Sequence, residues 1–211
     1  RAPTWPGVAA EPAHARGSRL APPPAAFRRI TSSCFFTSQG VAMAEPSVRR
    51  AHEADRPVLE RLWLMFRHDM SEFGGTLPGP DGTFRSERLV SALGDPGWAP
   101  YLLTLGEHPA GLAFVRGLTG PVRVLNSFFV VRGARRTGLG LHAVREITAR
   151  HPGPWEIAFQ ERNAIAARFW RRVATELAGA AWTEERRPVP GRPELPPDNW
   201  ISFAVPPAPA A

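Results

Sequence analysis

Apolar and polar residues alternate along this chain in two rhythms, one typical of helices and one typical of strands. Apolar residues spaced three or four positions apart predict helices at residues 56–73, 85–93, 138–150 and 164–177. Short apolar runs of β-prone residues predict strands at residues 47–51, 101–105, 110–118, 122–131, 155–159, 180–186 and 199–205. The resulting order, β-α-α-β-β-β-α-β-α-β-β, predicts an α/β fold in which helices flank a central mixed β-sheet.

Capping and turn residues set the ends of these elements. Asp55 precedes the first helix and is expected to cap it, with Pro57 in the first turn, where a missing N–H costs nothing. Asn163 is expected to cap the last helix in the same way. The proline-rich stretch 188–197 is predicted to be a loop between the two closing strands.

The first 42 residues show neither rhythm and are predicted to be a disordered or non-native extension. Prolines at positions 3, 6, 12 and 22–24 interrupt both helix and sheet hydrogen bonding there. The segment is either sequence upstream of a true start at Met43, which we favour, or a transit peptide, because it is rich in Arg and Ser and poor in acidic residues. The folded domain is then expected at residues 43–205, followed by a disordered tail at 206–211.

The charge of the chain is unevenly distributed. The whole sequence has a net charge of +7 and contains no lysine. Residues 1–42 hold five arginines and one glutamate, for a net charge of +4, whereas residues 43–211 hold 21 arginines and 18 acidic residues, for a net charge of +3. The predicted domain is therefore close to neutral, which disfavours a nucleic-acid partner.

Cysteine usage and hydropathy exclude further classes. Cys34 is the single cysteine, so the chain has neither a disulfide framework nor a cysteine metal site, and we expect no metal. No apolar run reaches the ~18 residues needed to span a membrane. We therefore expect a cytoplasmic protein that contacts no membrane, and the sequence leaves open whether it forms a homodimer.

The most informative stretch of the sequence is Arg135-Arg136-Thr137-Gly138-Leu139-Gly140. It follows the longest predicted strand and opens a predicted helix. Glycines let backbone N–H groups approach an anion closely, and a helix N-terminus adds roughly half a positive charge. The two arginines add fork-shaped donors that match phosphate oxygens. The stretch therefore predicts a phosphate-binding turn, and the absence of Gly-Lys-Ser/Thr excludes a Walker-type loop.

In its motifs and element order, the sequence resembles the GCN5-related N-acetyltransferases (GNAT). In that family an acetyl-CoA motif, Arg/Gln-x-x-Gly-x-Gly/Ala, lies between the fourth strand and the third helix, and residues 135–140 match it. A second element, Asn-x-x-Ala-x-x-aromatic-Tyr, follows the fifth strand and is matched by Asn163, Ala166, Phe169 and, in place of the tyrosine, Trp170. The element order also agrees from residue 47 to residue 203.

The resemblance implies acetyl-CoA as the co-substrate and assigns residues to it. Backbone N–H groups from Arg136 to Gly140 would hold the pyrophosphate, with Arg135 at the edge of the turn. The main chain at Val130 and Val131 would pair with the pantetheine arm like an added strand, and an N–H near Val130 would polarise the thioester carbonyl. Asn163 would donate a hydrogen bond to the same arm.

The residues that would move protons are less well defined by the sequence. Family members often carry a tyrosine at the position of Trp170, and its hydroxyl can protonate the leaving CoA thiolate; an indole N–H has no useful acidity near neutral pH. Side chains in the middle of the fourth and fifth strands should line the site, which nominates Asn126, Ser127 and Glu156. Of these, only Glu156 could act as a base, directly or through water.

Two acidic residues of the first helix, Asp69 and Glu72, could attract a cationic amine, because the early helices of the family shape the acceptor pocket. The sequence thus predicts an N-acetyltransferase that moves acetyl from acetyl-CoA to a primary amine of a small molecule by direct attack. Two alternatives remain: a protein lysine or N-terminal acetyltransferase, and a non-catalytic CoA-binding or regulatory module, which the missing tyrosine at position 170 motivates.

Overall fold

The computed structural model describes residues 44–189, 191–192 and 194–207, and the predictions made for residues 1–42 and for most of the tail lie outside them. The described strands are β1 (Pro46–Arg50), β2 (Trp98–Leu105), β3 (His108–Arg116), β4 (Arg123–Val130), β5 (Gly153–Phe159), β6 (Trp182–Arg187) and β7 (Asp198–Val205). The helices are α1 (Arg56–Gly74), α2 (Glu87–Gly94), α3 (Leu139–Ala149) and α4 (Ala164–Ala178), with two short 3₁₀ turns, η1 (Glu53–Asp55) and η2 (Arg132–Ala134). The predicted element order is confirmed.

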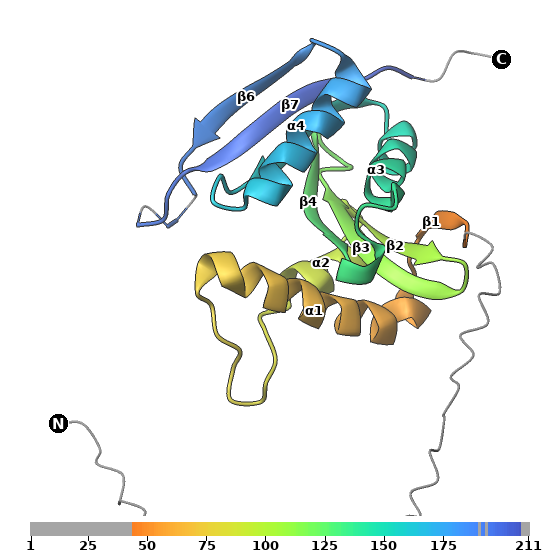
Figure 1. The fold of residues 1–211 in the computed structure, drawn as a ribbon, viewed down its shortest axis with the longest axis vertical. Helices are drawn as coiled ribbons and strands as arrows, with labels where there is room; N and C mark the ends of the chain where they lie inside the picture. Colours follow the sequence, from red (N-terminus) through yellow and green to blue (C-terminus); the bar gives the residue numbers. More distant parts are fainter. Residues whose placement is uncertain (1–43, 190, 193, 208–211) are drawn as a thin grey trace, which may run out of the picture. The chain divides into compact units, whose positions relative to one another are not determined.

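All seven strands join one sheet, in the order β1-β2-β3-β4-β5-β7-β6 (Figure 1). Every neighbouring pair is antiparallel except β4 and β5, which run parallel and are joined by the crossover helix α3. The two closing strands pair as predicted; they run antiparallel, and β7 lies between β5 and β6. The sheet is therefore mixed, as the sequence predicted.

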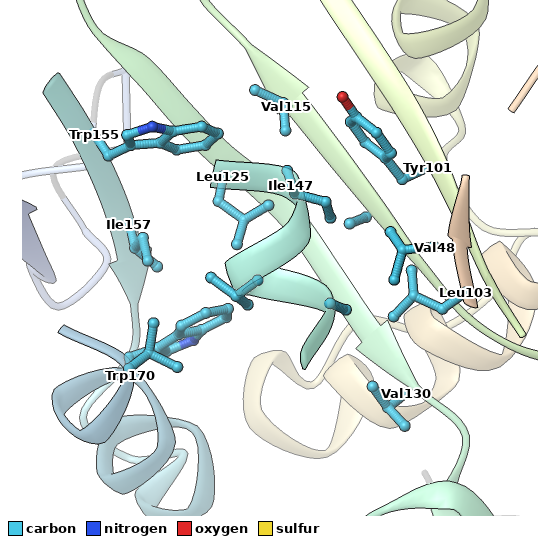
Figure 2. Close-up of a cluster of buried hydrophobic side chains, with 14 of the residues drawn as sticks. Val48, Tyr101, Leu103, Val115, Leu125, Val130, Ile147, Trp155, Ile157 and Trp170 are labelled. Atoms are coloured by element: carbon cyan, nitrogen blue, oxygen red, sulfur yellow. The ribbon is translucent and has the colours of Figure 1, made fainter. Parts of the chain in front are cut away.

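Helices cover both faces of the sheet, and each face has its own hydrophobic core. The larger core lies under α3 and α4 and includes Trp155 and Ile157 of β5, Leu125 of β4 and Ile147 of α3 (Figure 2). The smaller core lies under α1 and α2 and draws its strand residues from β2, β3 and β4. No described residue of β5, β6 or β7 belongs to this smaller core. The face of those three strands turned away from α4 is called the open face below.

Strand β4 leaves β5 halfway along its length. The two strands are paired only where Arg123–Leu125 lies opposite Trp155–Ile157, although β4 continues to Val130 and β5 to Phe159. Strand β3 follows β4 to its end. Beyond Leu125, β4 therefore has a strand partner on one edge and a diverging strand on the other, and this divergence positions the site.

Two local predictions are wrong, namely the start of β2 and the role of the Asp55 side chain. Strand β2 begins at Trp98, before the predicted start at Tyr101. Pro100 is tolerated in the strand because β1 has ended opposite it, so no partner there requires an N–H from Pro100. The Pro100 carbonyl still accepts from the Ala51 N–H at 2.9 Å. Asp55 precedes α1 but does not cap it with its side chain. Its carboxylate instead accepts from the His52 N–H at 2.9 Å and from Arg49 at 2.7 Å.

Candidate functional site

The turn between β4 and α3 contains two residues with left-handed backbone, Arg136 and Gly138. Gly138 precedes the helix with φ = 92°, a conformation that favours glycine. Arg136 has φ = 66° and is the single non-glycine residue with positive φ in the described part of the chain. Such local strain is often held in place at ligand-binding segments. Arg136 is also exposed, so its guanidinium is open to solvent.

The first turn of α3 presents backbone N–H groups without a strong cap. Among the described residues no side chain caps the helix, and the Leu139 N–H has only a long contact of 3.4 Å to the Thr137 hydroxyl. That hydroxyl itself donates to the Ala134 carbonyl at 2.9 Å, and this hydrogen bond stabilises the turn. A helix start of this kind carries partial positive charge and available donors, which suits an anion.

Gly140, the last glycine of the motif, serves packing. A Cβ atom at this position would lie 3.3 Å from two ring atoms of Phe169, on α4. Phe169 in turn stacks on Phe128 of β4, with ring centroids 5.9 Å apart. The missing side chain therefore lets the start of α3 approach the aromatic residues that join α4 to β4.

Arg135 has partners within the protein, whereas its sequence neighbour Arg136 is exposed. The Arg135 guanidinium forms an ion pair with Asp69 of α1, and its Nε donates to the Val130 carbonyl at 2.9 Å. Arg132 reaches the same carboxylate at 3.0 Å. Burial raises the pKa of the Asp69 carboxyl, but the hydrogen bonds from the two arginines outweigh it, so the net shift is downward. Asp69, expected from the sequence to attract the acceptor amine, is instead the anchor of the turn.

The free edge of β4 is defined by its hydrogen-bond pattern. The Val131 N–H donates to the Ala110 carbonyl at 2.9 Å, and the Val131 carbonyl accepts from the Ala134 N–H at 2.9 Å, so both groups are used within the protein. Because successive residues of a strand direct their N–H groups to opposite edges, the N–H groups of Phe128 and Val130 point toward the diverging β5. Of the predicted pair, Val130 is the residue that faces the divergence.

Asn126 occupies a β-bulge where β4 leaves β5. Strand β3 passes directly from Phe114, opposite Ser127, to Val115, opposite Leu125, so Asn126 has no partner residue on β3. Bulges of this kind redirect side chains and end strand pairing. The side-chain oxygen of Asn126 accepts from the Ser127 hydroxyl at 3.4 Å.

Glu156 lies on the open face, one residue before the end of the β4–β5 pairing. It stands opposite Val124 on β4 and opposite Ser202 on β7. Its carboxylate accepts from Arg187 of β6 at 2.8 Å, and the Ser202 hydroxyl lies 3.5 Å away. The side chain is 21% exposed, so water can reach this carboxylate.

Helix α4 places two predicted residues near the divergence. The Asn163 side chain caps the helix, because its Oδ1 accepts from the Ala166 N–H at 3.0 Å. Trp170 is buried in the larger core (Figure 2). Its ring centroid lies 5.2 Å from that of Phe128 on β4 and 4.7 Å from that of Phe169. The residue at the tyrosine position therefore lies against the strand whose edge is free.

The sequence did not single out the groups that gather on the α2 side of the bulge. Arg88 of α2 directs its guanidinium to the Asn126 carbonyl at 3.5 Å, the long limit of a hydrogen bond. Asp198, at the start of β7, lies close enough to Arg88 for each charge to influence the other. No motif links positions so far apart in sequence, and only the fold brings them together.

The described residues show no sign of a metal site or a membrane span. None of their His, Cys, Asp and Glu side chains form a group of three or more that could hold a metal ion. No helix of this part of the chain is both long and apolar enough to cross a membrane.

Comparisons with known proteins identify the fold. No protein-family model matches the sequence, and no curated protein matches it either. Among solved structures, an acetyltransferase from Thermus thermophilus is similar, with a TM-score of 0.57 and 18% identity, over 77% of this chain and 99% of that one. An acetyltransferase of the GNAT family from Staphylococcus aureus has a TM-score of 0.53 and 11% identity, over 76% of this chain and 99% of that one.

A third similar structure contains a ligand. It is the ribosomal L7/L12 α-N-protein acetyltransferase in complex with coenzyme A, with a TM-score of 0.53 and 14% identity, over 76% of this chain and 94% of that one. Structural similarity at such low sequence identity establishes the fold but not the activity. Together with the element order and the divergence of β4 from β5, these likenesses show that the chain has the fold of the GCN5-related N-acetyltransferases.

Proposed function

We propose that this protein is an N-acetyltransferase that moves the acetyl group of acetyl-CoA to the primary amine of a small molecule. One observation carries the proposal: the short segment 131–138 joins the β4 edge that faces the divergence from β5 to the uncapped start of α3. A helix start that can bind an anion therefore lies close in the chain to a free strand edge. That combination suits a ligand with a pyrophosphate at one end and an amide-containing arm, which is the chemistry of a CoA thioester.

Each part of acetyl-CoA has a matching group in this arrangement. The pyrophosphate would accept from the backbone N–H groups of residues 136–140, with the exposed Arg136 beside it. The pantetheine arm would lie along β4, and the Val130 N–H would polarise the thioester carbonyl. Asn163 already uses its side-chain oxygen as a helix cap, so only its amide N–H₂ would be offered to the arm.

The reaction is a direct acyl transfer. The lone pair of the neutral amine attacks the thioester carbonyl carbon, a C–N bond forms, the C–S bond breaks, and its electron pair leaves with the CoA sulfur. The proton lost by the nitrogen goes to Glu156 through water, because this carboxylate lies on the open face beside the divergence. The thiolate takes its proton from solvent, because the indole of Trp170 cannot supply one.

Two alternatives are favoured by specific observations. The similar ribosomal enzyme is an α-N-protein acetyltransferase, so a protein N-terminus is a second class of acceptor for this fold. Trp170 replaces the usual proton donor, which favours a module that binds CoA without turnover. Both alternatives keep acetyl-CoA in the site and differ from the proposal in the acceptor or in the chemistry.

The test uses the full chain and separates these outcomes. We expect acetyl-CoA to raise the melting temperature, since a ligand that binds only the folded state stabilises it. We also expect release of free thiol when a panel of small primary amines is added. If acetyl-CoA leaves the melting temperature unchanged, the proposal is wrong. Stabilisation without thiol release from any small amine would favour the binding module, and release with peptides alone would favour a protein acceptor.

A further inference from the structure

Arg88 occupies an unusual position for a surface arginine. It belongs to the first turn of α2, a helix that packs over β2 and β3, yet its guanidinium reaches the carbonyl of the bulged Asn126 on β4 at 3.5 Å. The bulge marks the point where β4 leaves β5. Arg88 therefore stands on the α2 side of the divergence, where an acceptor would approach a thioester held along β4.

No described carboxylate lies within 4.0 Å of the Arg88 guanidinium, whereas Arg132, Arg171 and Arg187 each pair with a carboxylate at 3.0 Å or less. Loss of solvent lowers the pKa of Arg88, and the charges of Arg67 on α1 and Arg116 on β3 lower it further. Arg88 is nevertheless exposed to solvent. Arg67 and Arg116 are thus like charges near Arg88, and Asp198 and Glu87 are opposite charges near it, while solvent still reaches its side chain.

Arg67 adds a buried, unsatisfied donor near Arg88. Its Nε is buried and has no hydrogen-bond partner among the described residues, while its guanidinium carbon lies 5.9 Å from the centre of the Phe84 ring. Positive charges that converge from α1, α2 and β3 repel one another, and partial burial strengthens the repulsion. A bound anion would relieve that repulsion.

Asp198 limits which anion can bind. It lies at the start of β7, on the open face, and its Oδ1 is buried without a hydrogen-bond partner among the described residues. Burial raises the pKa of this carboxyl, whereas Arg88 and Arg162 lower it. A fixed negative charge here would repel a doubly charged phosphate more strongly than a singly charged carboxylate. A planar carboxylate also matches the fork of an arginine in two parallel hydrogen bonds.

We propose that the acceptor amine also carries a carboxylate, as an amino acid does, and that Arg88 binds this carboxylate beside the bulge of β4. This inference rests on the proposed function and names its substrate class. The carboxylate is unchanged in the reaction and holds the acceptor with its amine directed toward the divergence of β4 and β5. Arg67 and Arg116 raise the positive potential around it without touching the reacting atoms.

The test measures acceptor binding without turnover. Isothermal titration into the full chain saturated with CoA compares glycine, β-alanine and 4-aminobutyrate with methylamine, ethylamine and propylamine, which lack the carboxylate. We expect at least one amino acid to bind about tenfold or more tightly than its matched amine, as a charge-assisted pair predicts. Arg88→Gln should abolish this preference, while Arg61→Gln, which removes the same charge from an exposed position on α1, should retain it.

Two results would overturn the inference. One is equal affinity for the amino acid and the matched amine in all three pairs. The other is a preference that persists in Arg88→Gln. Acetyl-CoA affinity is measured separately on the same variants and should be unchanged in Arg88→Gln, because Arg88 lies outside the 135–140 turn. If the unmodified chain does not bind acetyl-CoA, the proposed function itself is contradicted. Failure of the proposed function is therefore distinguishable from failure of the inference about Arg88.

Discussion

Asp69 and Arg135 lie 66 positions apart in the sequence and form an ion pair that ties α1 to the turn after β4. Arg132 shares the same carboxylate at 3.0 Å, so one acidic side chain holds both ends of the η2 segment. The Asp69 side chain is only 18% exposed, and a partly buried carboxylate with two arginine partners is held more firmly than a surface pair. The proposed phosphate turn is therefore braced from the opposite side of the sheet.

Replacing Asp69 should weaken the contact between α1 and the turn. We expect Asp69→Asn to weaken acetyl-CoA binding by about tenfold and to lower the free energy of unfolding by about 1–3 kcal/mol, because the side chain loses its charge and one of the two oxygens that accept from the arginines. Isothermal titration and thermal unfolding measure the two effects. The control is Glu72→Gln, an exposed position on the same helix. A larger loss of acetyl-CoA affinity in the control would contradict the role given to Asp69.

Gly138 tests the turn directly. Its φ of 92° disfavours any side chain, although no atom within 4 Å would clash with an added Cβ. Gly138→Asp should therefore strain the turn and also place a negative charge beside the pyrophosphate, so acetyl-CoA affinity should fall by about a hundredfold or more. Gly133→Asp adds the same charge at a position with open space and ordinary φ, and it should have a smaller effect. Equal effects would show that net charge alone is responsible.

The predictability of the fold follows from how local its signals are. Periodicity, prolines and glycines predicted the order of the elements and the glycine turn, because these signals act within a few residues. The insertion of β7 between β5 and β6 depends on long-range pairing, as does the link from Asp69 to Arg135, and neither leaves a local pattern. The Arg88 cluster was missed for the same reason, since its charges come from α1, α2, β3 and β7.

Glu156 is the candidate base and can be tested against a neighbour. Glu156→Gln should lower kcat by about 10²-fold or more, as loss of a general base does. Glu185→Gln is a matched control, because Glu185 pairs with the same Arg187 without facing β4. Steady-state kinetics with a single amine measures both variants. Equal losses in the two would indicate that the Arg187 network, and not the base, matters.

Trp170 should be dispensable as a proton donor. Trp170→Phe keeps an aromatic ring against Phe128 and removes the indole N–H, so kcat should stay within about threefold of the unmodified chain. The smaller ring leaves space in the core and should cost about 1–3 kcal/mol of stability, which thermal unfolding measures. A fall in kcat of about 10²-fold, with acetyl-CoA affinity unchanged, would show instead that the indole N–H takes part in the reaction.

Tyr101 and His151 should make stability depend on pH. The Tyr101 hydroxyl lies 2.6 Å from the His151 Nε2, and burial, reinforced by Arg50, Arg123 and Arg150, lowers the pKa of this histidine below its usual value of about 6.5. The folded state therefore binds this proton less readily than the unfolded state does. The stabilisation is complete above the unfolded pKa and is lost as the pH falls below it.

The measurement compares melting temperatures at pH 7.5 and pH 5. His151→Gln removes the titrating group, so its melting temperature should fall less between these two pH values than that of the unmodified chain. The expected difference is about 2–4 °C for each kcal/mol of linked stability in a domain of this size. His108→Gln, at an exposed position in the β2–β3 hairpin, should behave like the unmodified chain. An unchanged pH dependence in His151→Gln would assign the effect to other groups.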